Sequence, residues 1–292
     1  MSKPVAHPVN GIDHCFALVA DLDLAAQRYA ALGFTLSPRG LHSAAKGSGN
    51  HTIMFPKDYV ELLGIVHPTE LNAPRRQLLQ TQGQGLHAIA CRVDDAEQAA
   101  RDLAALGLRT EGFGSFDRPV PLTDGTTGRA AFSIVSFAPD ETPRSTVFMC
   151  QHKTPETVWL PELLDHPNTA CGLESVQAVS DHPETEAAAF ARLWRHGTVQ
   201  GAEGCFTVTT GPDSAAIKIM TQTAMAKYFP GMDLDRTPRQ AFSAMTIRVE
   251  RLQSVTDCLR AAGITPVATA NGLAVAPDHA AGVIVEFVPA KG

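Results

Sequence analysis

Residues 11–34, GIDHCFALVADLDLAAQRYAALGF, carry a pattern that recurs along the chain. Residues 12–19 are apolar and rich enough in β-formers to predict a strand. Asp21 is a candidate helix cap, and an apolar face follows it over residues 22–32. Gly33 stands where the left-handed residue that ends a helix is expected. The segment therefore predicts a strand followed by an amphipathic helix.

The strand–helix pattern is repeated in residues 91–108, CRVDDAEQAARDLAALGL, where a constant shift of 74 positions turns Val19, Asp21 and Gly33 into Val93, Asp95 and Gly107. A third copy, IRVERLQSVTDCLRAAGI, places Val249 and Gly263 at the same mutual spacing, and a worn copy begins near Gly172. Four units of strand, helix and three strands fit the length at about 75 residues each. The sequence thus predicts an α+β fold made of four βαβββ modules.

Composition excludes several classes of protein. The chain has 292 residues, 44% of them hydrophobic and 18% charged, which is typical of a soluble protein of about two domains. A net charge of -6 without a basic run argues against nucleic-acid binding. No apolar run approaches the roughly 20 residues of a membrane span, and residues 1–11 lack the core of a signal peptide. Six cysteines without a Cys-x-x-Cys pair favour reduced thiols and a cytoplasmic location.

The polar and proline-rich segments indicate where modules end. We expect a strand that starts at Phe34 and ends at the Pro-Arg-Gly turn of residues 38–40. Further strands are expected at Thr52–Phe55 and 59–66, and a connector with at most a short helical turn over 67–85. Glycines and prolines predict a loop-rich region up to Gly128. Residues 153–170 hold three prolines and are interpreted as a bridge between an N-terminal half, 1–152, and a degenerate C-terminal half, 171–292.

The first module resembles a known superfamily. A histidine at the start of a strand, an aspartate seven residues later, a helical tyrosine and Leu-Gly-Phe match the vicinal oxygen chelate proteins, through His14, Asp21, Tyr29 and residues 32–34. The runs SPRGLH (37–42), GSGNH (47–51), YVELLGI (59–65) and CQHKTPETVW (150–159) are similar to the glyoxalase-like domain proteins. The resemblance implies that modules pair into two cupped, open barrel-like mixed sheets around a small-molecule site.

Metal-binding members of that superfamily take ligands from the first and last strands of each module. The resemblance assigns His14 and Glu61 to such positions, and both suit Zn, Mn, Ni or Fe. The 74-residue shift maps His14 onto Ala88, so His87 becomes a ligand only if a bulge re-aims it. In the last strand of the second module Cys150 or Gln151 stands at the ligand position, and His152 shares the face of Cys150. The metal candidates are His14, Glu61, His87 and His152.

Without a metal, His14 and Glu61 still qualify as catalytic residues, since a buried carboxylate can accept a proton near neutral pH. The simpler interpretation is that Glu61 pairs with His14 or Arg39. The candidate substrate-binding residues are Asn50, His51, Arg118 and Gln151. A turn-capping asparagine, a surface histidine and a solvated loop are the plain alternatives for the first three.

The second half is poorer in polar candidates. Glu174 and Ala244 occupy the positions equivalent to His14, and Glu286 ends the fourth module, so solvated strand carboxylates are favoured over a second metal site. The resemblance implies an enzyme of lyase or isomerase type that acts on a small oxygenated metabolite in the N-terminal cup, with or without one divalent metal. The alternative is a metal-free binding protein of the resistance type. An extradiol-type dioxygenase is a further alternative that Ala88 disfavours, and a homodimer stays open.

Overall fold

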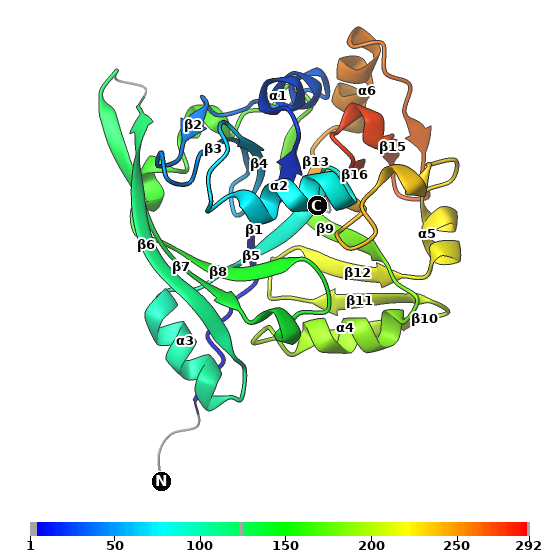
Figure 1. The fold of residues 1–292 in the computed structure, drawn as a ribbon. Helices are drawn as coiled ribbons and strands as arrows, with labels where there is room; N and C mark the ends of the chain where they lie inside the picture. Colours follow the sequence, from blue (N-terminus) through cyan, green and yellow to red (C-terminus); the bar gives the residue numbers. More distant parts are fainter. Residues whose placement is uncertain (1–4, 123–124, 291–292) are drawn as a thin grey trace.

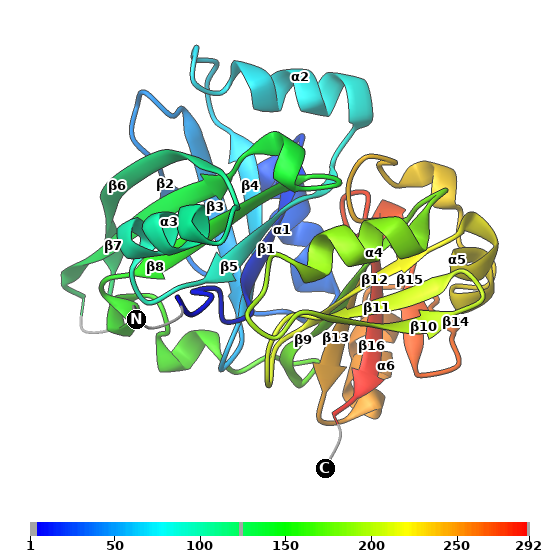
Figure 2. The same cartoon turned by 90° about the horizontal axis from the view of Figure 1, so that it is seen from below.

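The computed structural model describes residues 5–122 and 125–290, and it contains two eight-stranded mixed sheets (Figure 1). The first sheet uses strands between Ile12 and His152, and the second uses strands between Ala170 and Pro289. Turned by 90°, the two sheets lie next to each other, with α1 between them (Figure 2). The α+β fold of paired βαβββ modules is confirmed. No helix among the described residues is long and apolar enough to cross a membrane.

The first sheet has the order β2-β3-β4-β1-β5-β8-β7-β6. Its first module contains β1 (Ile12–Val19), α1 (Leu22–Ala31), β2 (Gly40–Leu41), β3 (Ser48–Met54) and β4 (Tyr59–Ile65). Its second contains β5 (Gly85–Arg92), α3 (Ala96–Ala105), β6 (Thr110–Pro121), β7 (Thr127–Phe137) and β8 (Thr146–His152). Strands β1 and β4 are parallel, as are β5 and β8, and the antiparallel β1–β5 pair joins the modules.

The second sheet repeats this plan with the order β10-β11-β12-β9-β13-β16-β15-β14. Its elements are β9 (Ala170–Val179), α4 (Pro183–Ala191), β10 (Thr198–Ala202), β11 (Cys205–Thr209), β12 (Ala216–Met220), α5 (Gln222–Tyr228), β13 (Ala244–Val249), α6 (Leu252–Ala261), β14 (Val267–Ala268), β15 (Leu273–Val275) and β16 (Ile284–Pro289). Short 3-10 turns at Pro155–Thr157 and Pro161–Leu163 lie in the segment between the sheets.

The repeated residues act as the sequence predicts. Asp21 and Asp95 cap their helices by accepting hydrogen bonds from the backbone N–H groups of Leu24 and Gln98. Gly33 follows α1 with a φ of +86°, a conformation that costs glycine little and other residues more.

A single apolar core joins the halves. It contains residues on the helix side of β1, such as Cys15 and Ala17, together with residues of β9 and β13. The rings of Phe34 and Phe287 stack with centroids 5.7 Å apart, and the Tyr29 hydroxyl donates to the Ala280 carbonyl at 3.2 Å. The helix sides of both sheets are therefore covered, and the opposite, concave side of the first sheet is left for the site.

Three local expectations were wrong. The connector over 67–85 contains a ten-residue helix, α2 (Ala73–Gln82). None of its residues is buried, so its sequence lacks the strong apolar periodicity that would have predicted a helix. The expected loop after Gly107 contains the twelve-residue strand β6, paired along its length with β7. Gly112, with a φ of +69°, lies in the register shift of that pair, so the glycine marks a bulge within a strand. The strand expected between Phe34 and the Pro-Arg-Gly turn does not form, and the short strand β2 begins instead at Gly40, the last residue of that turn.

Candidate functional site

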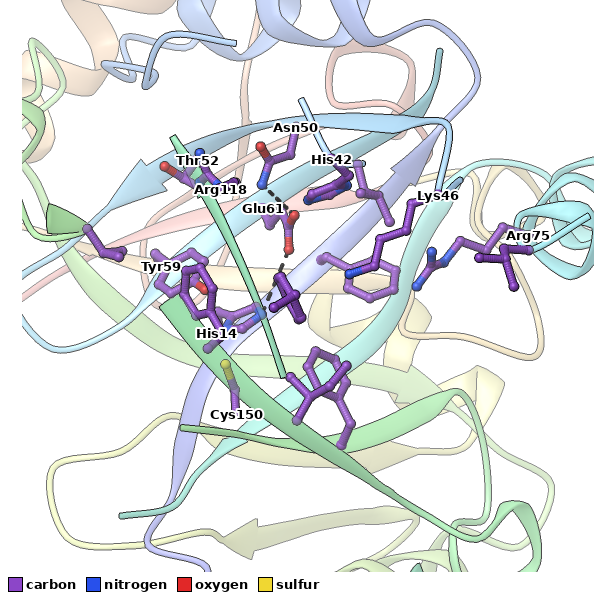
Figure 3. Close-up of a pocket in the computed structure, with 18 residues that line it drawn as sticks. His14, His42, Lys46, Asn50, Thr52, Tyr59, Glu61, Arg75, Arg118 and Cys150 are labelled. Carbon is purple, nitrogen blue, oxygen red and sulfur yellow. Dashed lines mark hydrogen bonds and ion pairs between the residues drawn. The ribbon is translucent and has the colours of Figure 1, made fainter. Parts of the chain in front are cut away.

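A cavity of about 320 Å³ opens on the concave side of the first sheet (Figure 3). Its wall is formed by side chains from β1, β3, β4, β6, β7 and β8, with further side chains from helix α2, from the segments before β3 and α2, and from the residues after β8. The lining residues are His14, Phe16, His42, Lys46, Asn50, Thr52, Tyr59, Glu61, Leu63, Leu71, Arg75, Phe116, Arg118, Phe132, Ile134, Phe148, Cys150 and Val158. The size and the mostly apolar wall with a few polar groups are typical of a small-molecule site.

His14 faces this cavity because alternate residues of β1 point to opposite sides of the sheet. Its neighbours Asp13 and Cys15 are both buried, and Cys15 packs in the core on the helix side. The imidazole stacks on the ring of Tyr59 with centroids 4.2 Å apart and meets the edge of Phe148 at 5.7 Å. The rings hold His14 in one orientation at the cavity wall.

Glu61 lies beside His14 on the neighbouring strand β4. Its Oε2 is 3.8 Å from Nε2 of His14, and its Oε1 accepts a hydrogen bond from Nδ2 of Asn50 at 2.6 Å. The sequence-predicted pair of His14 and Glu61 is thus brought together, and Asn50 holds the carboxylate. One carboxylate oxygen and one imidazole nitrogen are left facing the same space.

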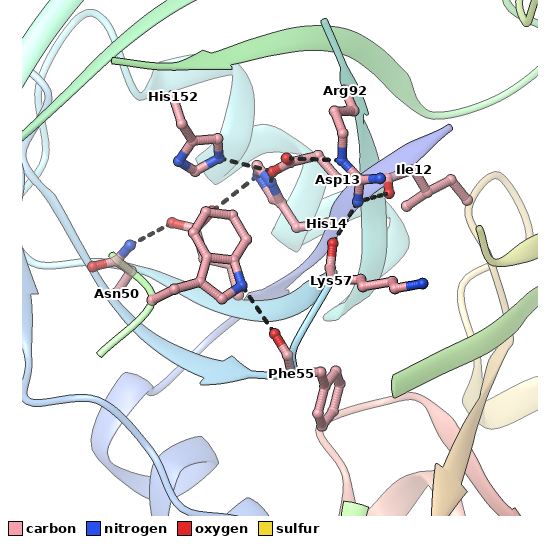
Figure 4. A network of polar contacts seen from close by, with 10 residues as sticks. Ile12, Asp13, His14, Asn50, Phe55, Lys57, Arg92 and His152 are labelled. Atoms are coloured by element: carbon pink, nitrogen blue, oxygen red, sulfur yellow. Dashed lines mark hydrogen bonds and ion pairs between the residues drawn. The ribbon is translucent and has the colours of Figure 1, made fainter. Parts of the chain in front are cut away.

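Asp13 reaches the same side as His14 because of a β-bulge. The β1–β5 register pairs Ile12 with Cys91 and His14 with Ala90, so Asp13 is the extra residue. Its Oδ1 lies 2.7 Å from Nδ1 of His14 and 2.9 Å from Nε2 of His152 (Figure 4). Burial would raise the pKa of Asp13, but the hydrogen bonds from the two histidines hold it well below its usual value.

This contact assigns the tautomer of His14. An ionised carboxylate only accepts hydrogen bonds, so Nδ1 of His14 carries the proton that points to Asp13. Neutral His14 therefore presents an unprotonated Nε2 toward Glu61 and the cavity. The arrangement is that of a carboxylate-oriented imidazole.

Asp13, His14 and His152 form a cluster of ligand atoms within 4.8 Å of one another that could hold a metal ion. The fit is tight, because both histidines already donate to the same oxygen of Asp13. Nδ1 of His152 is buried without a hydrogen-bond partner, but the rings of Trp159, Phe132 and Tyr59 surround that imidazole at centroid distances of 4.8, 5.1 and 6.1 Å. On the cavity side, His14 Nε2 and Glu61 offer two donors, fewer than a typical catalytic metal site uses.

Three cations line the cavity. Lys46 lies over the ring of Phe116, with its Nζ 3.4 Å from the centroid, and Arg75 lies 5.9 Å from the ring centroid of Phe16. Burial lowers the pKa of Lys46, and the nearby Arg75 lowers it further. Burial also lowers the pKa of His42 to about 4, so this imidazole is neutral near pH 7.

Several predicted residues lie elsewhere. His51 contacts the backbone carbonyl of Ser37 at 2.8 Å, and the Gln151 side chain accepts from the backbone N–H of Ala96 at 3.3 Å. A bulge does occur at His87, but its ring contacts the Gly83 carbonyl at 2.9 Å. The structure brings none of these three to the cavity. Arg118 and Asn50 line it, and of the two candidates Cys150 and Gln151 it is Cys150 that faces it.

Sequence reasoning missed Asp13, Lys46 and Arg75. The 74-residue repeat maps Asp13 onto His87, and both are the extra residue of a bulge at the start of their strands. A polar residue next to His14 in an apolar strand was the available signal. Lys46 and Arg75 come from a turn and from the unexpected helix α2, which no periodicity connects to the cavity.

In the second cup the one predicted polar residue, Glu286, is buried among its neighbours. Glu286 is fully buried and accepts hydrogen bonds from the hydroxyls of Thr246 at 2.8 Å and Thr269 at 2.6 Å. Met225 and Phe229, from α5 and the residue after it, pack into the neighbouring apolar cluster. Glu286 is thus a buried, hydrogen-bonded carboxylate, and the expectation that it is solvated was wrong.

Comparison with known proteins agrees with this fold. Residues 12–194 match the family described as a glyoxalase-like domain. None of the curated proteins matches the sequence. A hypothetical protein from Staphylococcus aureus superposes with a TM-score of 0.70 at 13% identity, over 96% of this chain and 99% of that one.

Two enzymes share the fold at low identity. A mutant 4-hydroxymandelate synthase from Streptomyces coelicolor superposes with a TM-score of 0.55 at 11% identity, over 98% of this chain and 94% of that one. A xylose isomerase-like TIM barrel/4-hydroxyphenylpyruvate dioxygenase fusion protein gives 0.56 at 13% identity, over 91% of this chain and 41% of that one. These likenesses concern the fold alone. Because the family match covers more than half of the sequence, the chain belongs to the glyoxalase-like domain family.

Proposed function

We propose that the protein is an enzyme of lyase or isomerase type that moves a proton on a small oxygenated metabolite bound in the first cup. One observation carries the proposal. Nε2 of His14 and Oε2 of Glu61 lie 3.8 Å apart at the cavity wall. His14 donates from its other nitrogen, Nδ1, to Asp13, and the other oxygen of Glu61, Oε1, accepts a hydrogen bond from Asn50. Two proton-accepting atoms in one apolar cavity are the minimum for general acid–base catalysis.

The roles follow from what each group can do. Oε2 of Glu61 is positioned to take a proton from a carbon next to a carbonyl group. The C–H electron pair then moves to the carbonyl oxygen and gives an enolate. His14 takes or returns a proton at an oxygen through Nε2, while Asp13 stabilises its charged form. If the proton is returned to the former carbonyl carbon, the reaction is an isomerisation. If instead a leaving group departs from the carbon on the other side of the enolate, the reaction is an elimination.

One divalent ion, of Zn, Mn, Ni or Fe, would be held by Nε2 of His14 and the carboxylate of Glu61, with Asp13 supporting the imidazole from its other nitrogen. When bound, such an ion supplies Lewis-acid stabilisation of the enolate oxygen. The extradiol alternative is disfavoured. Although two histidines and one carboxylate are grouped, Asp13 and His152 do not line the cavity.

The test is proton exchange in D₂O, followed by NMR on a panel of small 2-oxo and 2-hydroxy carbonyl compounds. Wild-type protein should speed the loss of a carbon-bound proton signal, and Glu61→Gln should slow it by about 10²–10⁴-fold. Glu286→Gln is the matched control, because it changes the buried carboxylate of the other cup and should leave the rate unchanged. Compounds that bind without exchange in wild type would favour the metal-free binding protein instead.

A further inference from the structure

The charges of the cavity wall do not balance among the described residues. Lys46, Arg75 and Arg118 line it, and Glu61 is the one carboxylate that does. None of the three cations has a carboxylate oxygen within 4.0 Å in the described part of the chain, whereas surface arginines such as Arg101 and Arg129 do. Unpaired cations on the wall of a mostly apolar cavity attract an anion.

Lys46 and Arg75 lie next to each other at one end of the cavity, while Arg118 lies nearer Asn50 (Figure 3). Each of the first two is held over an aromatic ring, which fixes the position of its stem. Gly40 makes room for Arg118, because a Cβ atom at this glycine would lie 2.8 Å from Nη1 of Arg118. The cations are thus placed by packing rather than left free in solvent.

The remainder of the wall selects for an apolar body. Phe132 and Ile134 of β7 and Phe148 of β8 line the cavity, and Leu63 and Val158 add to this surface. His42 is neutral and adds no positive charge. A ligand that satisfies both parts of the wall has a charged end and an apolar end.

We infer that the ligand of this cavity carries an anionic group, a carboxylate or a phosphate, which Lys46 and Arg75 bind, on an apolar body that packs against Phe132, Ile134 and Phe148. A guanidinium pairs two oxygens of either group, and an ammonium adds a third contact. Arg118 lies on the Asn50–Glu61 side of the cavity, away from the pair that binds the anionic group. The inference rests on the proposed function only in taking this cavity as the ligand site.

Binding of three matched probes tests the inference. Phenylacetate, phenyl phosphate and neutral phenylacetamide share the apolar body and differ in charge. At least one anion should bind about tenfold or more tightly than the amide by ligand-observed NMR titration, and added salt should weaken the anion alone. A stronger phenylacetate complex identifies a carboxylate, and a stronger phenyl phosphate complex identifies a phosphate.

Lys46→Met and Arg75→Met keep much of the apolar stem and remove the charge, so each should abolish the preference for the anion and leave amide binding unchanged. Arg101→Met, on the outer face of α3, is the control and should behave like wild type. Melting temperatures verify that the variants fold. Equal binding of all three probes to wild type, or an anion preference that survives both variants, would overturn the inference.

The outcome is separable from the enzyme proposal. If the protein catalyses proton exchange but binds charged and neutral probes equally, the proposed function stands and this inference is wrong. If it binds anions through Lys46 and Arg75 but catalyses no proton exchange, the inference stands and the proposed enzymatic function is wrong.

Discussion

Nδ1 of His14 lies 2.7 Å from Oδ1 of Asp13, and this contact determines which nitrogen of the imidazole faces the cavity. The contact exists because a bulge in β1 brings two successive side chains to the same side of the sheet. Asp13 itself does not line the cavity. It therefore acts on a ligand only through His14.

Asp13→Asn should lower the proton-exchange rate by about 10–100-fold, because the amide no longer stabilises the charged imidazole or fixes its tautomer. Since Asp13 touches no ligand, kcat should fall while KM changes little. Steady-state exchange kinetics on the best compound of the panel measure both. Asp23→Asn, which alters an exposed carboxylate paired with Arg39, is the control. An unchanged kcat in folded Asp13→Asn would contradict the positioning role.

Metal content distinguishes the two possible ligand sets. If the purified protein holds a divalent ion, elemental analysis should show that His14→Ala and Glu61→Ala both lose it, whereas His152→Ala keeps it. The reason is that the cavity-side nitrogen of His14 is the free one. If His152→Ala lost the metal ion and Glu61→Ala kept it, the ion would instead lie in the buried cluster of Asp13, His14 and His152.

Asp58 predicts a pH dependence of stability. Its side chain is buried and accepts from the backbone N–H of Leu173 in the second half, and burial raises its pKa to about 6. Because the folded pKa is above the unfolded value, the stabilising contribution is full below about pH 4 and is lost as the pH rises through 6.

Asp58→Asn keeps an oxygen acceptor for Leu173 without the buried charge. Its stability relative to wild type should therefore increase between pH 4.5 and 7.5, by up to about 3 kcal/mol. Urea unfolding of both proteins at the two pH values measures the difference. A constant difference across this range would show that Asp58 does not change its protonation on folding.

Gly33 and Gly107 form a matched pair for stability. Both follow a helix with positive φ, of +86° and +79°, so alanine should cost roughly 1–2 kcal/mol at either position from backbone strain. At Gly33 a Cβ atom would also lie 2.7 Å from Sγ of Cys258 and 2.8 Å from Cβ of Asn168, whereas at Gly107 nothing lies within 4 Å. Gly33→Ala should cost a further roughly 1–3 kcal/mol in denaturant unfolding. Equal losses would mean that the core relaxes around the methyl group.

The repeat in the sequence predicted the module and its length, whereas the pairing of modules into cupped sheets followed from the family resemblance. Caps such as Asp21 and helix-ending glycines such as Gly33 are local signals, and each acts in the structure as expected. Helix α2 escaped prediction because none of its residues is fully buried, and its leucines, Leu78 and Leu79, are only partly buried against the first sheet. Its residue Arg75 was missed with it.

The site could be predicted only in part. His14 and Glu61 occupy inward positions that strand alternation and the family resemblance indicate, and the structure brings them together. Asp13 could not be placed, because alternation points it to the other side and a bulge reverses this. The same bulge occurs at His87, yet that ring turns to the Gly83 backbone, so the presence of a bulge does not settle where the side chain points.

The tautomer of His14 tests the central claim most directly. In ¹⁵N-labelled protein at mildly alkaline pH, long-range ¹H–¹⁵N correlation spectra should show His14 neutral, protonated at Nδ1 and bare at Nε2. The assignment is made by loss of the signal in His14→Ala, and Asp13→Asn should alter the pattern. A proton on Nε2 instead would leave no base facing Glu61 and would contradict the account.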